Sequence, residues 1–175
     1  NNCLNFDVPP IEPPVIIQPY EDPIGQQGAW LPLSDFFNIS WYQPGSSGIG
    51  SYTLEIKKFI SREQATEFKN QGKPDEFFDG LEDVMTPKHN LPGFNYNVYI
   101  ADEAIDIEPR DLMAVRITAE AGEYIYLNNG RSNIVTFYFG VDDNLLCENP
   151  SYDIDLAWPL AGDTLPFRNL ALMLD

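Results

Sequence analysis

Acidic side chains gather in one stretch of the chain. Carboxylates occur there at five positions, Asp102, Glu103, Asp106, Glu108 and Asp111. Oxygen-rich loops can bind Ca²⁺, so Asp102, Asp106 and Asp111 are candidate ligands. Because the spacing differs from that of the calcium loop in helix–loop–helix proteins, a solvated acidic loop is the favoured interpretation. Nothing in the sequence holds two of these carboxylates in a cleft at the separation that glycoside hydrolysis needs.

The single histidine gives little support to catalysis. His89 lies in the polar segment Thr86–Asn90. A hydrolase triad or a zinc centre needs a histidine beside other catalytic or ligating groups. The sequence also contains no glycine-rich phosphate loop and no nucleophile elbow. We therefore expect a surface role for His89, no catalytic residue and no cofactor.

Aromatic residues in loops are further candidates for ligand binding. Trp30 precedes a predicted strand, and Tyr124 and Tyr126 occupy another predicted loop. Exposed rings at such positions can stack on a sugar or pack against a partner protein. Trp41, at an inward position of an alternating strand, is expected in the core instead.

The charge of the chain limits its partners. The net charge is −17, from 27 acidic and 10 basic residues. Such a surface repels phosphate backbones and anionic lipid head groups, which disfavours nucleic acid and membrane surfaces as partners. Solubility explains the charge, and a site for cations or a basic partner is the alternative. No apolar run approaches the ~20 residues that cross a bilayer, so direct membrane insertion is not expected.

Strands dominate the predicted secondary structure. They are predicted at Phe37–Trp41, Tyr52–Lys57, Phe94–Ile100, Met113–Ala119 and Ile134–Gly140. Most of these stretches alternate apolar and polar residues with the period of a half-buried strand. With the proline-flanked edge strand Val15–Ile17, they give the six or seven strands of an antiparallel β-sandwich.

Two local expectations follow from the pattern. In the second strand, Tyr52, Leu54 and Ile56 should face the core, whereas Thr53, Glu55 and Lys57 should face water. Between strands, Ser61 and Gln64 resemble a capping box and Gly72 suits a helix end, which predicts one short helical insertion over Ser61–Lys69.

The two ends of the chain do not belong to these strands. Apolar residues alternate again near the C-terminus, at Ile154, Leu156, Trp158, Leu170 and Leu172. Because two strands alone form no stable core in water, this segment should continue into another domain or lie on a partner or on the first domain. These residues are therefore candidate partner contacts.

The two cysteines, Cys3 and Cys147, flank the strands. They pair with each other, or each pairs with a residue of a neighbouring module. An odd number of strands would put the two ends at opposite poles, which disfavours the direct bridge. Without a C-x-x-C pair, zinc and thioredoxin-type chemistry are unsupported.

Three groups of segments, in order, resemble the fibronectin type III-like modules of Bacteroidota surface and secreted proteins. They are Pro13–Pro19, then Phe37–Trp41 with Tyr52–Ile56, then Val115–Ala119 with Asn128–Ser132 and Thr136–Gly140. The resemblance implies an all-β, immunoglobulin-like sandwich over residues 11–140. Residues 1–10 would end a preceding module, and residues 141–175 would be a linker and the first strands of a following one. Met113 departs from the family, which usually has a tyrosine there.

The resemblance also implies a function and a location. The chain would be a non-catalytic structural or protein–protein interaction module of an extracytoplasmic protein, at the cell surface or secreted. Many such proteins are associated with the outer membrane or with type 9 secretion and gliding. Thr164 fits the short O-glycosylation pattern of that phylum. The alternative is an accessory carbohydrate-binding module of a secreted enzyme, using the loop aromatics.

Overall fold

The computed structural model describes residues 10–20, 29–45, 51–102, 104–120 and 125–141. The chain divides into two compact units, Asn1–Asp142 and Asp143–Asp175, and every described residue belongs to the first. No helix in these ranges is long and apolar enough to cross a membrane. The described part is mostly β-sheet, arranged in two sheets with few helices.

The smaller sheet has three antiparallel strands in the order β1-β3-β7. They are β1 (Val15–Gln18), β3 (Phe36–Tyr42) and β7 (Asn95–Tyr99). The alternation in β3 turns Phe37, Ile39 and Trp41 inward, where all three are buried. The core position expected for Trp41 is therefore confirmed.

The larger sheet has six strands, with β2-β9-β8-β4-β5 as its order and β6 also paired with β4. Its strands are β2 (Ala29–Pro32), β4 (Tyr52–Lys58), β5 (Glu82–Asp83), β6 (Lys88–Leu91), β8 (Leu112–Ala119) and β9 (Val135–Val141). The β2–β9 pair is parallel, and the others are antiparallel.

One hydrophobic core lies between the two sheets. Tyr52, Leu54 and Ile56 of β4 are fully buried in it together with Trp41, as their spacing predicts. Met113 of β8 is also fully buried in this core. Met113 therefore occupies a closely packed core position.

The predicted helical insertion is present, and its ends follow from the sequence. In α1 (Arg62–Asn70), the Ser61 side chain accepts a hydrogen bond from Gln64 N–H at 3.2 Å. At the other end, Gly72 adopts a φ of +77°. Lys73 N–H then donates to Phe68 C=O at 2.9 Å, which completes a Schellman-type end.

Two further helical segments were not predicted. Helix α2 (Asp75–Asp79) begins after Pro74 without a side-chain cap, and it is too short to show a helical period. The 3₁₀ segment η1 (Leu127–Gly130) occupies the predicted Asn128–Gly130 turn, and Asn128 and Asn129 have positive φ there.

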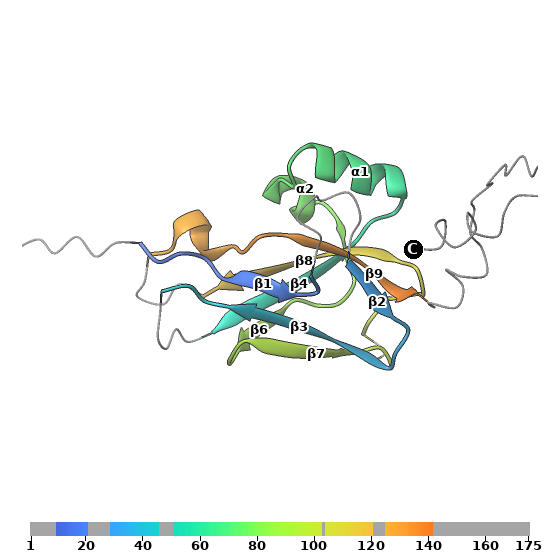
Figure 1. Ribbon diagram of the computed structural model, residues 1–175, viewed down its shortest axis with the longest axis horizontal. Coiled ribbons are helices and arrows are strands. Elements are labelled where there is room, and N and C mark those ends of the chain that lie inside the picture. Colours follow the sequence, from blue (N-terminus) through green and yellow to red (C-terminus); the bar gives the residue numbers. More distant parts are fainter. Residues whose placement is uncertain (1–9, 21–28, 46–50, 103, 121–124, 142–175) are drawn as a thin grey trace, which may run out of the picture. The chain divides into compact units, whose positions relative to one another are not determined.

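Helices α1 and α2 cover the outer face of the six-stranded sheet, on the side away from β3 and β7 (Figure 1). A second hydrophobic cluster forms under them, from Phe59, Ala65, Phe68, Phe78, Leu81, Leu112, Ala114 and Ile134. The expectation that Lys57 faces water is therefore wrong. Its side chain is buried, with Nζ 6.0 Å from the Phe78 ring centre and 2.6 Å from Asp83 Oδ1.

Candidate interaction surface

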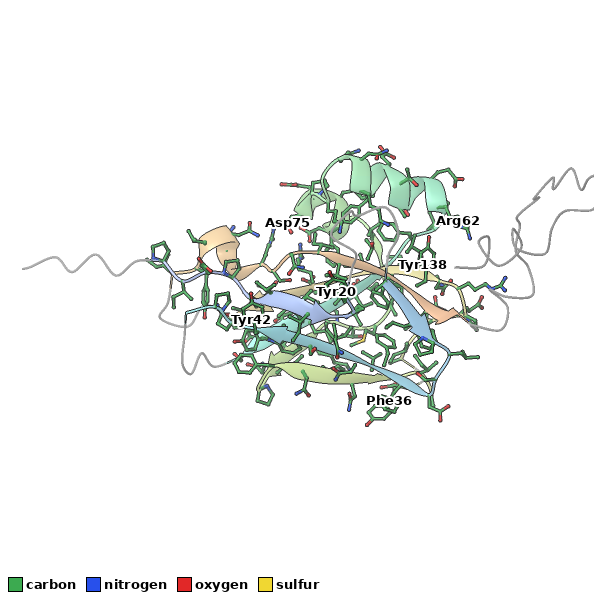
Figure 2. All side chains as sticks on the ribbon, in the orientation of Figure 1. Tyr20, Phe36, Tyr42, Arg62, Asp75 and Tyr138 are labelled. Atoms are coloured by element: carbon green, nitrogen blue, oxygen red, sulfur yellow. The ribbon has the colours of Figure 1, made fainter. Side chains whose placement is uncertain are left out.

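The outer face of the three-stranded sheet is bare among the described residues and presents large side chains to solvent. Phe36, Tyr42 and Ile17 are each 47% exposed, and Tyr99 is 57% exposed. Figure 2 shows Phe36 on the side of the molecule opposite the helices. We call this surface the sheet face; its members are Val15, Ile17, Gln18, Phe36, Asn38, Ser40, Tyr42, Asn95, Asn97 and Tyr99.

Strand register sets the arrangement of these side chains. Phe36 pairs with Tyr99, and their ring centroids lie 5.6 Å apart at an interplanar angle of 37°. In the middle of the face, Asn38 Nδ2 donates to Asn97 Oδ1 at 2.9 Å. Tyr42 is the last residue of β3, at the opposite end of the strand from Phe36. The sheet face therefore runs from an aromatic pair, across a band of amides, to a further ring.

The chemistry of the sheet face differs from that of the whole chain. None of its members carries a charge at neutral pH, although the net charge of the chain is −17. Removing charged groups from water is expensive, and the centres of protein interfaces are depleted of charge and enriched in aromatic residues. An uncharged aromatic and amide surface of this kind can be covered by a partner at low desolvation cost.

A hollow of about 300 Å³ adjoins the sheet face at the Phe36 end. Tyr20, which is 69% exposed, and Phe36 both line it, together with Leu31 and Pro32 of β2. The hollow contains no ionisable side chain other than the Tyr20 phenol among its lining residues. It extends the uncharged surface of the sheet face.

The acidic loop is organised by a lysine. Lys58 Nζ lies 3.0 Å from Asp111 Oδ2 and 3.6 Å from Asp106 Oδ2. The hydrogen bond to Asp111 is the main cause of a raised Lys58 pKa. The third candidate, Asp102, accepts a hydrogen bond from Ala104 N–H at 3.0 Å. In the part of the chain that the structure describes, which omits Glu103, no three such groups come together as a metal site.

His89 belongs to a hydrogen-bonded cluster that the sequence did not reveal. Its Nδ1 lies 3.0 Å from Thr53 Oγ1, and that hydroxyl donates to Glu120 Oε1, also at 3.0 Å. Hydrogen bonds from the Ser51 hydroxyl and the Asn90 N–H lower the pKa of Glu120. The Thr53 hydroxyl faces a carboxylate and a histidine on the surface, so the cluster joins β4, β6 and the end of β8 without forming a cleft.

A second cluster, under the helices, centres on Arg116. Its side chain is buried and contacts Glu55 at 2.8 Å, Asp75 at 2.9 Å and Asp79 at 2.6 Å. The Phe78 ring centre lies 4.4 Å from the guanidinium carbon. Burial alone would lower the pKa of Arg116, but the hydrogen bonds to Glu55 and Asp79 raise it. These pairs attach α2 to β4 and β8, which is a structural role.

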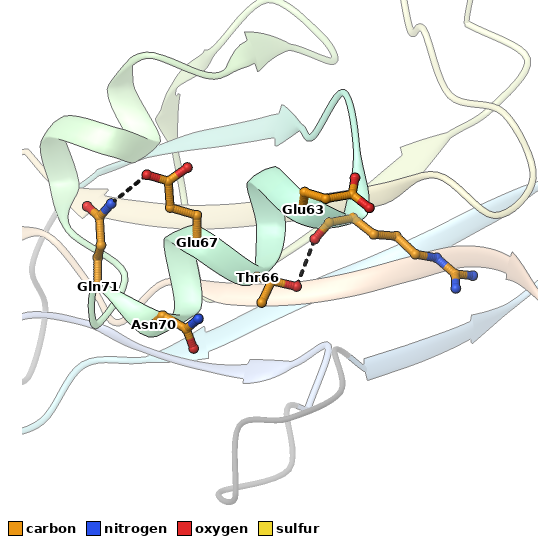
Figure 3. A pocket seen from close by; sticks show the side chains of 6 residues that line it. Glu63, Thr66, Glu67, Asn70 and Gln71 are labelled. Atoms are coloured by element: carbon orange, nitrogen blue, oxygen red, sulfur yellow. Dashed lines mark hydrogen bonds between the residues drawn. The ribbon is translucent and has the colours of Figure 1, made fainter.

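The helical insertion also carries a groove of about 450 Å³ (Figure 3). Its described lining is entirely from α1 and the residue that follows it. The polar groups there satisfy each other, since Gln71 Nε2 donates to Glu67 Oε1 at 3.0 Å and Thr66 Oγ1 donates to Arg62 C=O at 2.9 Å. The groove offers no ring and no unsatisfied buried group for a ligand.

The predicted binding residues are placed differently from expectation. Trp30 lies within β2, paired with Tyr138 of β9, and not in a loop, because a distant strand provides its hydrogen-bond partner. Tyr126 is only 8% exposed and packs against the main core, so the expectation of an exposed ring there is wrong. The other residues singled out from the sequence lie outside the described residues: Cys3, Tyr124, Cys147, Ile154, Leu156, Trp158, Thr164, Leu170 and Leu172.

No protein-family model, curated protein or solved structure matches the chain. Function must therefore be inferred from the surface chemistry. The sequence reasoning missed the sheet face, although one signal was present. The polar positions of the predicted Phe37–Trp41 strand, Asn38 and Ser40, are uncharged, which is unusual for solvent-facing positions in so acidic a chain.

Proposed function

We propose that the chain is a non-catalytic protein–protein interaction module, and that its sheet face binds the partner. We further propose that it works outside the cytoplasm, in a multi-module surface or secreted protein of the Bacteroidota type, including those linked to the outer membrane or type 9 secretion. The location rests on the sequence resemblance, and the binding role rests on the sheet face.

Strand order supports the finer proposal of a fibronectin type III-like sandwich. In immunoglobulin-like folds, strands A, B and E share one sheet, and strands C, F and G share the other. Here β1, β3 and β7 would be A, B and E, and β4, β8 and β9 would be C, F and G. On this assignment α1 and α2 are an insertion after strand C.

The observation that carries the binding role is the absence of charge on the sheet face. Exposed apolar groups occur singly on most surfaces, but contiguous exposed patches commonly mark interaction sites. Here the Phe36–Tyr99 pair, the Asn38–Asn97 pair and Tyr42 are contiguous across β3 and β7. Protein partners suit this surface because it is uncharged and carries aromatic rings at both ends of a band of amides.

Photo-crosslinking tests this function. A benzophenone amino acid replaces Tyr42, on the sheet face, or Glu67, on the exposed side of α1, as the matched control. Each protein is then illuminated with cell-envelope and secreted fractions of the source organism. We expect one defined cross-linked product from position 42 and none from position 67. Excess unlabelled wild-type protein should suppress the product from position 42, whereas excess Phe36→Ser protein should not. Equal products at both positions would refute the proposal.

A carbohydrate-binding module is the second candidate, because the same face places amides beside rings. Asn38, Ser40, Asn97 and Gln18 could hydrogen-bond sugar hydroxyls next to Phe36. The tilt of 37° between Phe36 and Tyr99 is less suited to a flat sugar platform than a coplanar pair. A glycan array signal that is lost in Phe36→Ala would favour this candidate over the first.

A further inference from the structure

Strand β7 is an edge strand without the usual protection. It pairs only with β3 among the described strands. Its sequence, Asn-Tyr-Asn-Val-Tyr, contains no charge and no proline, and its register with β3 is continuous from Tyr99 to Asn95. Native edge strands are commonly blunted by charges, prolines, bulges or shortness, because an open edge pairs with any extended chain. We call the unpaired side of β7 the open edge.

The other described edges have such protection. Strand β1 lies between Pro14 and Pro19 and has a register irregularity before Gln18. Strand β2 ends at Pro32, also with a register shift. Strand β5 is only two residues long, and both of them, Glu82 and Asp83, are acidic. Strand β6, which pairs only with β4, begins with Lys88 and His89 and has an irregular register. The contrast makes β7 the exception.

Backbone hydrogen bonds show which groups point to the open edge. Trp41 N–H donates to Phe94 C=O, and Ile100 N–H donates to Asp35 C=O, both at 2.9 Å. Hydrogen-bonded residues alternate along an antiparallel strand, so even-numbered residues of β7 bond to β3. The remaining residues direct their N–H groups away from β3: Asn95, Asn97 and Tyr99.

The two ends of the open edge differ in charge. At the C-terminal end, Asp35 C=O accepts from Ile100 N–H, and Asp102 N–H donates to Tyr99 C=O at 3.2 Å, so both aspartates adjoin that end. Both side chains are exposed, and neither forms a salt bridge with another described residue. The N-terminal end follows Pro92, Gly93 and Phe94 and is uncharged.

Resting on the proposed function, we infer that the open edge of β7 takes up an extended segment of the partner protein as an added strand. The segment is uncharged opposite Asn95–Tyr99 and carries lysine or arginine beside Asp35 and Asp102. It runs antiparallel to β7, the commoner orientation for added strands, so its basic residues lie at its N-terminal end. Strand addition gives backbone affinity, and the side chains give specificity.

A second copy of the chain is the less suitable occupant. Each copy has a net charge of −17, so two copies repel each other. A partner strand with a basic end instead neutralises the acidic end of the open edge. Charge complementarity therefore favours a different protein.

A synthetic peptide tests the inference directly. The probe is an acetylated peptide of alternating threonine and valine with lysines at its N-terminal end. Two controls carry glutamates in place of the lysines, or N-methyl groups on alternate backbone nitrogens. Titrated into the full chain, the probe should slow amide hydrogen exchange at Asn95, Asn97 and Tyr99, while both controls should not. Unchanged exchange at all three amides would overturn the inference.

Variants separate the open edge from the sheet face. Asn97→Pro removes both the central outward N–H and the Asn97 amide of the sheet face, whereas the control Asn97→Ala removes only the amide. The ladder to β3 uses other residues, so an edge strand tolerates the proline. We expect about ten-fold weaker probe binding for Asn97→Pro and unchanged binding for Asn97→Ala. Asn95→Pro, at the first residue of the strand, is the second variant and should weaken binding less. Unchanged exchange of core amides such as that of Leu54 checks that each variant folds.

The outcomes are distinguishable from failure of the proposed function. Cross-linking at position 42 that persists in Asn97→Pro would leave the proposed function standing and overturn the open-edge inference. If the chain binds the probe but cross-linking at position 42 fails, the proposed function would be overturned and the binding of an extended chain at the open edge would stand. Analytical ultracentrifugation checks for a dimer of the chain. If the wild-type protein is a dimer and Asn97→Pro makes it a monomer, the open edge binds a second copy, which would overturn the assignment to a different partner protein.

Discussion

The outer faces of the two sheets are built on opposite principles. On the six-stranded sheet, α1 and α2 bury apolar residues such as Phe68, and the ionic groups of Arg116 and Lys57 are paired. On the three-stranded sheet, the rings of Phe36 and Tyr42 stay exposed, and no charged group stands between them. One face is charged but covered, and the other is uncharged but bare. The bare face is therefore the one that we propose as the binding surface.

Truncating a ring on each face should give the largest contrast. Phe68 is fully buried under the helices, whereas Phe36 is 47% exposed on the sheet face. Phe68→Ala should lower the free energy of unfolding by about 3–5 kcal/mol, because it leaves a cavity. Phe36→Ala should lower it by less than about 1 kcal/mol. Urea unfolding of both variants measures the difference, and equal losses would break the comparison.

Removing the buried cation should also be costly. Arg116→Met removes the buried cation that Glu55, Asp75 and Asp79 share, and it leaves the two aspartates only the more exposed Arg131. We expect a loss of about 3 kcal/mol in the free energy of unfolding, as for other broken buried pairs. Arg62→Met, at an exposed position of α1, is the control and should change it by less than about 0.5 kcal/mol. A neutral Arg116→Met would mean that the network does not hold α2 in place.

The uncovered end of the six-stranded sheet should show a smaller, pH-dependent effect. Hydrogen bonds from Ser51, Asn90 and Thr53 lower the pKa of Glu120 below the ordinary value of a glutamate side chain. A carboxylate whose pKa is lower in the folded than in the unfolded state stabilises the fold when the pH is above its unfolded-state pKa. This stabilisation is lost as the pH falls through the folded-state pKa. Glu120→Gln should therefore be less stable than wild type near pH 7, and the gap should close on acidification.

Thermal or urea unfolding at about pH 7 and about pH 3 measures this gap. Because Glu120 lies near the surface, solvent screens its interactions and the effect should be modest. A gap that stays constant with pH would show that the substitution acts through packing and not through the charge.

The smallest effect on stability should come from the sheet face itself. Tyr42→Ser removes a ring that is 47% exposed on the outer side of β3, so the free energy of unfolding should change by less than about 0.5 kcal/mol. The same variant should fail to compete with wild type for cross-linking at position 42. A large stability loss would make Tyr42 structural and would weaken the functional interpretation of the sheet face.

Local patterns in the sequence were sufficient for much of the framework. Alternation placed Tyr52, Leu54 and Ile56 in the core because a strand turns every second residue to the same face. Capping chemistry placed α1 because Ser61 and Gly72 act on their own neighbours in the chain. Both signals are local, which is why they could be read without a structure.

Non-local packing decided what the sequence could not predict. Lys57 and Arg116 occupy outward positions of β4 and β8, where charged residues normally face water. Only the docking of α2, which is too short to show a period, buries them. The same limit applies to Trp30, whose strand partner is more than a hundred residues away in β9. The sheet face was missed because its exposure depends on which of two outer faces the helices leave bare.

Hydrogen exchange of the whole chain, alone and bound to the protein that cross-links at position 42, tests the central claim most directly. We predict slower exchange in β1, β3 and β7, with the amides of α1 and α2 unchanged. Protection confined to α1 and α2, with none in the three-stranded sheet, would contradict the assignment of the sheet face as the binding surface.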